Sequence, residues 1–307
     1  MAVQLLSLPR PGESLAEMSV SPGLAVAWGL FIGVSFVASF FFLRVPPAAS
    51  RDDPTVIMAR IKAVSASIVI SLVLTYLLLN YLGVEDPAAL MGFRWTGLGL
   101  ALVLPIPLFM CFFLGSFVLA YFELELPGQM YFNFSRDVVA PLSEPSGWRN
   151  WIFAPFAEEL AFRSCIFPLM FLSGFRSPWI HLLVSLYFGV AHLNHLRDIR
   201  ARNIAAKHPR PTVAALVVVL VQLVYTSIFG TLAAYIYYRT GHILAAIMSH
   251  VVCNVMGFPS FGQIQNHPKQ AWLIWASFAL GIGIFCLLLG PLTDPVLFGN
   301  GVFFHLA

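Results

Sequence analysis

Long apolar segments dominate this sequence and constrain its fold more than any other feature. About eight of them approach the roughly 20 apolar residues that a helix needs to cross a bilayer. They lie at about 22–43, 62–82, 97–121, 150–173, 178–195, 212–238, 242–257 and 270–290. Only 10% of the 307 residues are charged, whereas a soluble domain has about 25%. The sequence therefore predicts an all-α, polytopic membrane protein with about eight transmembrane helices in a single integral membrane domain, residues 1–307.

The loops between these segments carry an uneven share of the positive charge. Twelve of the 17 Lys and Arg residues fall in the loops after the first, third, fifth and seventh segments. Because cytoplasmic loops are enriched in Lys and Arg, we expect the N-terminus outside the cytosol and the loop after the fifth segment inside it. The basic residues lie in short, separate loops and form no basic stripe. We therefore expect membrane lipid around the protein and no nucleic-acid partner.

Three charged residues, Glu158, Glu159 and Arg163, interrupt the fourth apolar segment. Burying a charge without a partner costs several kcal/mol, so an ionisable residue at membrane depth usually marks a functional site. Adjacent helical residues point about 100° apart, whereas residues four apart share a face. We therefore expect Glu159 to pair with Arg163 and Glu158 to point elsewhere. In the structural alternative, both carboxylates neutralise Arg163 and hold helices together.

Two other segments carry polar residues at a similar expected depth. His192 lies near the cytosolic end of the fifth segment, where Gly189 would let a neighbouring helix approach closely. His250 and Asn254 in the seventh segment are one turn apart and project from one face. At ~1.5 Å per residue, Glu158 and His250 each lie about 12 Å into their segments. We expect these side chains to meet in a catalytic core at about residues 149–259.

A carboxylate, a histidine and a His/Asn donor pair suit the hydrolysis of an amide. Glu158, assisted by His192, would deprotonate a water molecule. His250 and Asn254 would donate hydrogen bonds to the developing oxyanion. Residue types alone leave a second possibility open, a zinc ion held by Glu158, His192 and His250.

Other chemistries have weaker support. The sequence contains neither His-Glu-x-x-His nor Gly-x-Ser-x-Gly. Cys165 is close to the glutamates, but apolar surroundings disfavour its thiolate, and His195 is expected to be structural. A non-enzymatic scaffold or binding protein would be free to lose the polar set. A proton-coupled transporter would be expected to show internal repeats, which the sequence lacks.

Three motifs, at residues 158–163, 188–192 and 250–259, resemble those of a known family, the type II CAAX prenyl endopeptidases. The resemblance is closest to the eukaryotic, Ras-converting branch. It implies an intramembrane protease of the endoplasmic reticulum whose conical catalytic cavity opens to the cytosol. The substrates would be farnesylated or geranylgeranylated CAAX proteins such as Ras-type GTPases, which would lose their last three residues.

The same resemblance implies roles for individual residues. Glu158 would activate water together with His192, and His250 with Asn254 would support the oxyanion. Glu159 and Arg163 would support these catalytic residues. The resemblance also implies a glutamate mechanism with no metal and no cofactor.

Overall fold

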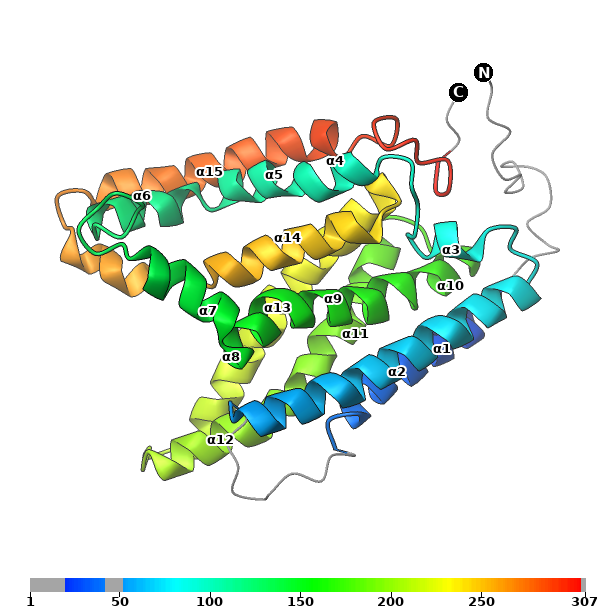
Figure 1. Ribbon diagram of the computed structural model, residues 1–307, viewed down its shortest axis with the longest axis horizontal. Helices are drawn as coiled ribbons and strands as arrows, with labels where there is room; N and C mark the ends of the chain where they lie inside the picture. The colour runs from blue at the N-terminus through cyan, green and yellow to red at the C-terminus, as the bar shows by residue number, and fades with distance from the viewer. Residues whose placement is uncertain (1–19, 42–51, 305–307) are drawn as a thin grey trace.

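The computed structural model describes residues 20–41 and 52–304, and every regular element within these ranges is a helix (Figure 1). The α-helices are α1 (Pro22–Ala38), α2 (Pro54–Tyr81), α3 (Pro87–Leu90), α4 (Leu98–Val103), α5 (Pro105–Phe112), α6 (Leu114–Phe122), α7 (Ala140–Ser143), α8 (Pro145–Trp148), α9 (Ala154–Glu159), α10 (Phe167–Leu172), α11 (Trp179–Ala191), α12 (His195–Ala205), α13 (Pro211–Thr240), α14 (Ile243–Met256) and α15 (Ala271–Leu292). The π-helical turns are η2 (Ser135–Val139), η3 (Arg149–Phe153) and η4 (Leu160–Ser164), and the 3-10 turns are η5 (His192–Asn194) and η6 (Phe261–Asn266). The all-α prediction is confirmed for this part of the chain.

Each apolar segment expected from the sequence contains helix, but the helices differ in length. Among the described residues, three helices are long and apolar enough to cross a membrane alone, namely α2, α13 and α15. A fourth candidate span joins α4 and α5 to α6, with a bend of 60° between Phe112 and Leu114. The polytopic membrane class is therefore supported, at a coarser level than the eight spans predicted.

The helix α2 begins at Pro54 rather than near residue 62, where the apolar segment begins. The Asp53 carboxylate caps it by accepting a 2.8 Å hydrogen bond from the Thr55 N–H. Pro54 suits the first turn, where its missing N–H leaves no bond unmade. The additional turns place Arg60 within the helix, although the sequence analysis had assigned this residue to a loop.

The helical run from α8 to α10 lies in the centre of the molecule, between α2 and α14 (Figure 1). Its side chains Phe162 and Phe167 are fully buried. The neighbouring helices α11 and α13 pack so closely that a Cβ on Gly189 would lie 2.4 Å from Ser227 Oγ. The close approach predicted at Gly189 is therefore confirmed, and it holds the end of α11 beside the central run.

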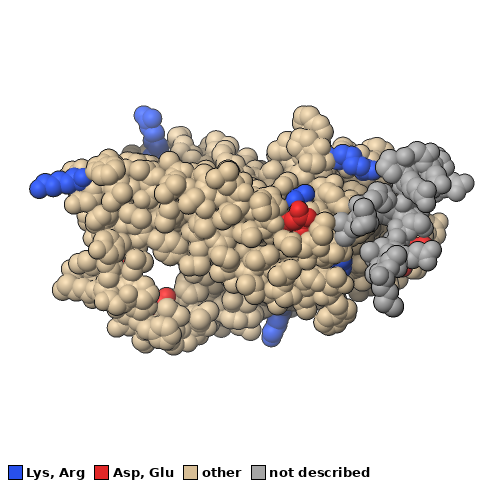
Figure 2. Space-filling model, turned by 90° about the horizontal axis from the view of Figure 1, so that it is seen from above, with Lys and Arg blue, Asp and Glu red and all other residues tan. Residues whose placement is uncertain are grey.

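The outer surface is largely uncharged. Figure 2 shows one face on which most of the visible surface is neither acidic nor basic and the charged side chains are few. Large apolar side chains such as Val69 on α2 and Val224 on α13 are more than half exposed. Exposed apolar surface of this extent is expected where lipid, rather than water, surrounds the helices.

Candidate active site

The helix that carries the two glutamates is continuous from residue 145 to residue 164 but contains two π-helical turns, η3 and η4. A proline follows each of them, Pro155 after η3 and Pro168 after η4. Proline lacks the N–H of a regular helical bond, and its ring clashes with the carbonyl four residues back. That carbonyl belongs to Trp151 in η3 or to Ser164 in η4. The wider turns relieve both clashes, and π turns are frequent at functional sites.

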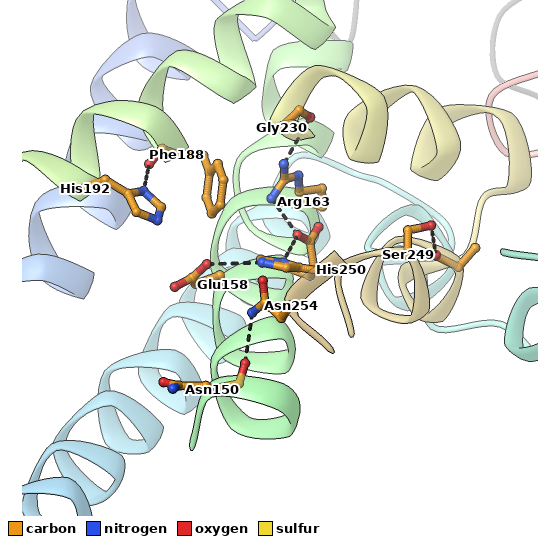
Figure 3. A network of polar contacts seen from close by, with 11 residues as sticks. Asn150, Glu158, Arg163, Phe188, His192, Gly230, Ser249, His250 and Asn254 are labelled. Carbon is orange, nitrogen blue, oxygen red and sulfur yellow. Dashed lines mark hydrogen bonds and ion pairs between the residues drawn. The ribbon is translucent and has the colours of Figure 1, made fainter. Parts of the chain in front are cut away.

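Glu159 is fully buried and connects two helices through one carboxylate oxygen. Its Oε1 accepts a 2.8 Å hydrogen bond from Arg163 Nη1 and another of 2.8 Å from His250 Nδ1 on α14 (Figure 3). The expected pair of Glu159 with Arg163 is thus present. The bond to His250 was not expected, because nothing in the sequence specifies which face of α14 meets α9.

Arg163 is fully buried and holds three helices together. Besides its bond to Glu159, its Nη2 donates to the Gly230 carbonyl of α13 at 3.0 Å. Its guanidinium carbon lies 4.8 Å from the centre of the Phe188 ring on α11, within cation–π range. Arg163 therefore balances the charge of Glu159 and leaves the Glu158 carboxylate without a cation of its own on this helix.

Glu158 points away from the Glu159–Arg163 pair, as the helical geometry predicts. Its side chain is 19% exposed, and its Oε2 lies 3.7 Å from His250 Nε2. That separation is longer than a hydrogen bond. An ionised carboxylate only accepts hydrogen bonds, so His250 Nδ1 carries the hydrogen that Glu159 binds. The other ring nitrogen, Nε2, is the atom that faces Glu158.

His192 follows the end of α11 and is fixed by its own helix. Its Nδ1 lies 2.9 Å from the Phe188 carbonyl oxygen. A carbonyl can only accept, so Nδ1 carries the hydrogen and Nε2 of the neutral ring keeps its lone pair. In Figure 3 the ring extends toward the side of the network on which Glu158 lies. Such a nitrogen is suited to accept a proton or to orient a water molecule.

Asn254 is anchored from the central helix. Its amide nitrogen donates a 2.9 Å hydrogen bond to the Asn150 carbonyl in η3. A primary amide carries two N–H groups, so this bond leaves one for another acceptor. His250 and Asn254 lie on the same face of α14, as their spacing predicts. Asn150 is a contact that the sequence analysis did not identify.

These side chains surround one cavity of about 1600 Å³, which Glu158, His192, His250 and Asn254 all line. Part of its wall is apolar and comes mainly from α5 and α13, with Phe109, Phe112, Phe113, Val217, Val221 and Ile228. Another part is charged and predominantly basic, with Arg60, Arg149, Arg197 and Arg202 beside Asp52 and Asp198. The cavity can therefore take a ligand with both a long apolar part and an anionic part.

Two further expectations concern His195 and a metal site. His195 also lines the cavity, and its Nδ1 lies 3.2 Å from Gln222 Oε1 on α13. The structural role expected for it stays a prediction. Among residues 20–41 and 52–304, no three His, Cys, Asp or Glu side chains form a group that could hold a metal ion.

Comparison with known proteins identifies the family. A family model described as Type II CAAX prenyl endopeptidase Rce1-like matches residues 141–256. The chain is 33% identical to CAAX prenyl protease 2 of Homo sapiens, over 97% of this chain and 92% of the human protein. It is 34% identical to CAAX prenyl protease 2 of Arabidopsis thaliana, over 94% of each chain. The protein of that name from Saccharomyces cerevisiae is 26% identical, over 78% of this chain and 81% of the yeast protein.

No solved structure matches the chain. The curated relatives extend the likeness well beyond residues 149–259, where the sequence motifs lie, to most of the chain. The resemblance drawn from the motifs is confirmed. The chain belongs to the type II CAAX prenyl endopeptidase family.

Proposed function

We propose that this protein is an endopeptidase that removes the C-terminal aaX tripeptide from prenylated CAAX proteins. The observation that carries the proposal is the convergence of Glu158, His192, His250 and Asn254 on one cavity in a chain of this family. The curated relatives bear the name CAAX prenyl protease 2. We take farnesylated and geranylgeranylated CAAX proteins as the substrate class, with the prenyl chain against the apolar part of the cavity wall.

In this proposal Glu158 is the general base. It takes a proton from a water molecule that His192 Nε2 helps to orient, and the oxygen attacks the scissile carbonyl carbon. Glu158 then returns the proton to the leaving amine as the carbon–nitrogen bond breaks. Because Arg163 already balances Glu159, the second carboxylate does not compete for this role.

The oxyanion is stabilised by Asn254 and His250. Asn254 donates through the amide N–H that Asn150 does not bind. His250 donates through Nε2–H, which requires a doubly protonated ring because Glu159 engages Nδ1–H. The Glu159 carboxylate stabilises that positive charge, as the buried carboxylate of a hydrolytic triad does for its imidazolium. Neither step needs a metal ion or a cofactor.

We also propose an eight-helix topology in the endoplasmic reticulum membrane, with the cavity open to the cytosol. α2, α13, α15 and the bent α4–α6 pair have the length of spans. The run from α8 to α10, with α1, α11 and α14, would supply the others. Within this run Glu158 lines the cavity, and Glu159 and Arg163 are fully buried, so none of the three faces lipid. The basic helix α12 would lie in the cytosol.

The orientation has a simple test at Asn133, which begins an Asn-x-Ser sequon. The proposed topology puts this residue in the cytosol, where it receives no glycan. Expression in a glycosylating cell followed by glycosidase digestion should leave the electrophoretic mobility unchanged. A glycan on Asn133 would reverse the orientation.

The activity is tested with purified protein in lipid vesicles. A farnesylated CAAX peptide should be cleaved before its last three residues, its unprenylated twin should not, and a chelator should change neither result. Glu158→Gln should lower kcat by about 10²–10⁴-fold, the usual contribution of a positioned base. Glu125→Gln, an exposed carboxylate outside the cavity wall, is the matched control and should retain full activity.

Three results would contradict this proposal in different ways. Full activity in Glu158→Gln would show that Glu158 is not the general base. Loss of cleavage with the chelator would favour the zinc alternative. Binding of the prenylated peptide by the wild-type protein without cleavage would indicate the scaffold alternative.

A further inference from the structure

Arg60 on α2 is a cation in the cavity wall that no acidic group of the described chain neutralises. Its Nε is buried and has no hydrogen-bond partner among residues 20–41 and 52–304. Its guanidinium carbon lies 5.8 Å from the centre of the Phe40 ring. By contrast, Arg149 in the same wall pairs with Asp52 at 2.9 Å, and Arg163 pairs with Glu159 at 2.8 Å.

An unpaired guanidinium in such a position calls for an anion. Its Nε–H is removed from water without an acceptor, which is unfavourable, while the half-buried side chain remains accessible to a ligand in the cavity. The guanidinium is planar and presents parallel N–H groups that match the two oxygens of a carboxylate. Arg60 is thus suited to a carboxylate that arrives with the ligand.

Helix geometry places Arg60 at the depth of Glu158. The Arg149–Asp52 pair joins the start of the central run to the start of α2, and the two helices then run in the same direction (Figure 1). Arg60 lies eight residues after Asp52 and Glu158 nine residues after Arg149. At ~1.5 Å per helical residue, Arg60 lies about 9 Å beyond Pro54 and Glu158 about 14 Å beyond Arg149, so their depths agree to within about one turn.

Aromatic contacts independently place Arg60 and Glu158 at a similar depth. The rings of Phe36 and Phe162 are 5.6 Å apart. Phe40 lies four residues, about one turn, after Phe36, and its ring contacts Arg60. One turn back from Phe162 toward the start of its helix is Glu158.

The lateral separation fits a short peptide. α2 packs against α9 and η4, and axes of packed helices are about 8–10 Å apart. An extended chain of three residues spans about 10 Å. We propose that Arg60 binds the C-terminal carboxylate of the substrate, which holds the bond three residues upstream at Glu158. This inference rests on the proposed aaX-removing activity, and it explains why a tail of that length is released.

The test compares a farnesylated CAAX peptide with its C-terminal carboxamide, which has the same length but no charge. Wild-type protein in lipid vesicles should cleave the acid with a KM about 10- to 100-fold below that of the amide, the value of one or two charge-assisted hydrogen bonds. Arg60→Gln should raise the KM of the acid by a similar factor, with kcat unchanged. Its KM and kcat for the amide should equal those of wild type, which also shows that the variant is folded.

A matched control is Arg202→Gln, which removes a positive charge from the exposed rim of the same cavity. It should keep the preference for the acid. If it loses the preference as Arg60→Gln does, a general positive field attracts the substrate and Arg60 is not its specific partner. Arg60→Lys should retain the charge but only part of the preference, because the bidentate geometry is lost.

Other outcomes separate this inference from the proposed function. If the wild type cleaves acid and amide equally well, or if Arg60→Gln keeps the preference, the Arg60 inference is wrong while the peptidase activity stands. A loss of both substrates in Arg60→Gln would assign Arg60 a structural role. If the wild type cleaves neither peptide, the proposed function itself fails.

Discussion

Two polar networks within residues 52–304 can be compared, one that reaches the cavity and one that does not. The Glu159 network consists of Glu159, Arg163, His250 and the Gly230 carbonyl. The Arg94 network consists of Arg94, His242 and Asn300 with the backbone carbonyls they bind. Both hold a guanidinium and a buried imidazole among apolar helices, but Arg163 is fully buried whereas Arg94 is half-buried. The two networks differ in their hydrogen-bond acceptors and in whether an ionisable residue that lines the cavity lies beside them.

In the Arg94 network the side-chain N–H groups of Arg94 and Asn300 donate to backbone carbonyls. Arg94 donates to the carbonyls of Thr240 at 3.4 Å, Phe298 at 3.4 Å and Gly299. Asn300 donates to the carbonyl of Tyr238 at 2.9 Å. These bonds fasten the segment after α15 to the end of α13, and neither Arg94 nor Asn300 lines the cavity. The role of this network is therefore structural.

In the Glu159 network the acceptor that Arg163 and His250 share is a carboxylate. An ionisable neighbour, Glu158, lines a large cavity. A carboxylate can hold a charged imidazole in place, whereas a carbonyl only accepts a bond from it. The comparison shows that buried charge alone does not mark a site. A functional site also needs an ionisable group that can reach the ligand.

The largest expected effect comes from Glu159→Gln. This change leaves Arg163 as a buried cation without a counter-charge, and breaking a buried pair costs roughly 3–5 kcal/mol. Thermal unfolding in detergent should show a lower midpoint, and the variant that remains folded should have a lower kcat because His250 loses its anionic partner.

A second substitution separates the two roles of Glu159. Combining Glu159→Gln with Arg163→Met removes both charges, which should restore much of the thermal stability but not the kcat. If kcat recovers together with the midpoint, the Glu159 network is purely structural, like the Arg94 network, and the distinction between the two is wrong.

A smaller effect is expected for Arg94→Met. The hydrogen bonds that Arg94 donates are lost, which should lower the free energy of unfolding by roughly 1.5–3 kcal/mol. The kcat for a prenylated peptide, measured well below the unfolding midpoint, should stay at the wild-type value. A specific fall in kcat would connect this network to catalysis.

The smallest effect is expected for Gly189→Ala, which forces α11 away from α13 because the new Cβ meets Ser227 Oγ at 2.4 Å. Overpacking of this kind costs about 1–3 kcal/mol. Gly283→Ala on α15 is the control, since nothing lies within 4 Å of its Cβ position. The control should be neutral or slightly stabilising in the same unfolding assay, because alanine favours helix. Equal destabilisation by both variants would argue against a close contact at Gly189.

Local patterns predicted much of this structure. Apolar segments gave the approximate positions of the helices, and the spacing of Glu159 and Arg163 gave their ion pair. The earlier start of α2 was also readable, since Asp53-Pro54 is a capping residue followed by a first-turn proline. Hydropathy alone did not register it, because that first part of α2 carries polar residues.

Contacts between distant segments were beyond the sequence. The bond of His250 to Glu159 joins residues 91 apart, and that of Asn254 to Asn150 joins residues 104 apart. Both depend on how α14 is rotated against the central helix, which the packing of several helices decides together. Single spacing rules specify a face of one helix but not the face of the partner that meets it.

The π-helical turns of the central helix have a consequence for the angular position of its side chains. A π turn accommodates one more residue than an α-helical turn, and each helical residue rotates the chain by about 100°. Since η3 precedes Glu158, this extra residue determines the direction in which both glutamates point around the helix axis. Deleting one residue within Arg149–Phe153 would leave every catalytic side chain in the sequence yet turn Glu158 away from its water. The orientation of the catalytic side chains therefore depends on the π-helical geometry of the turn that precedes them.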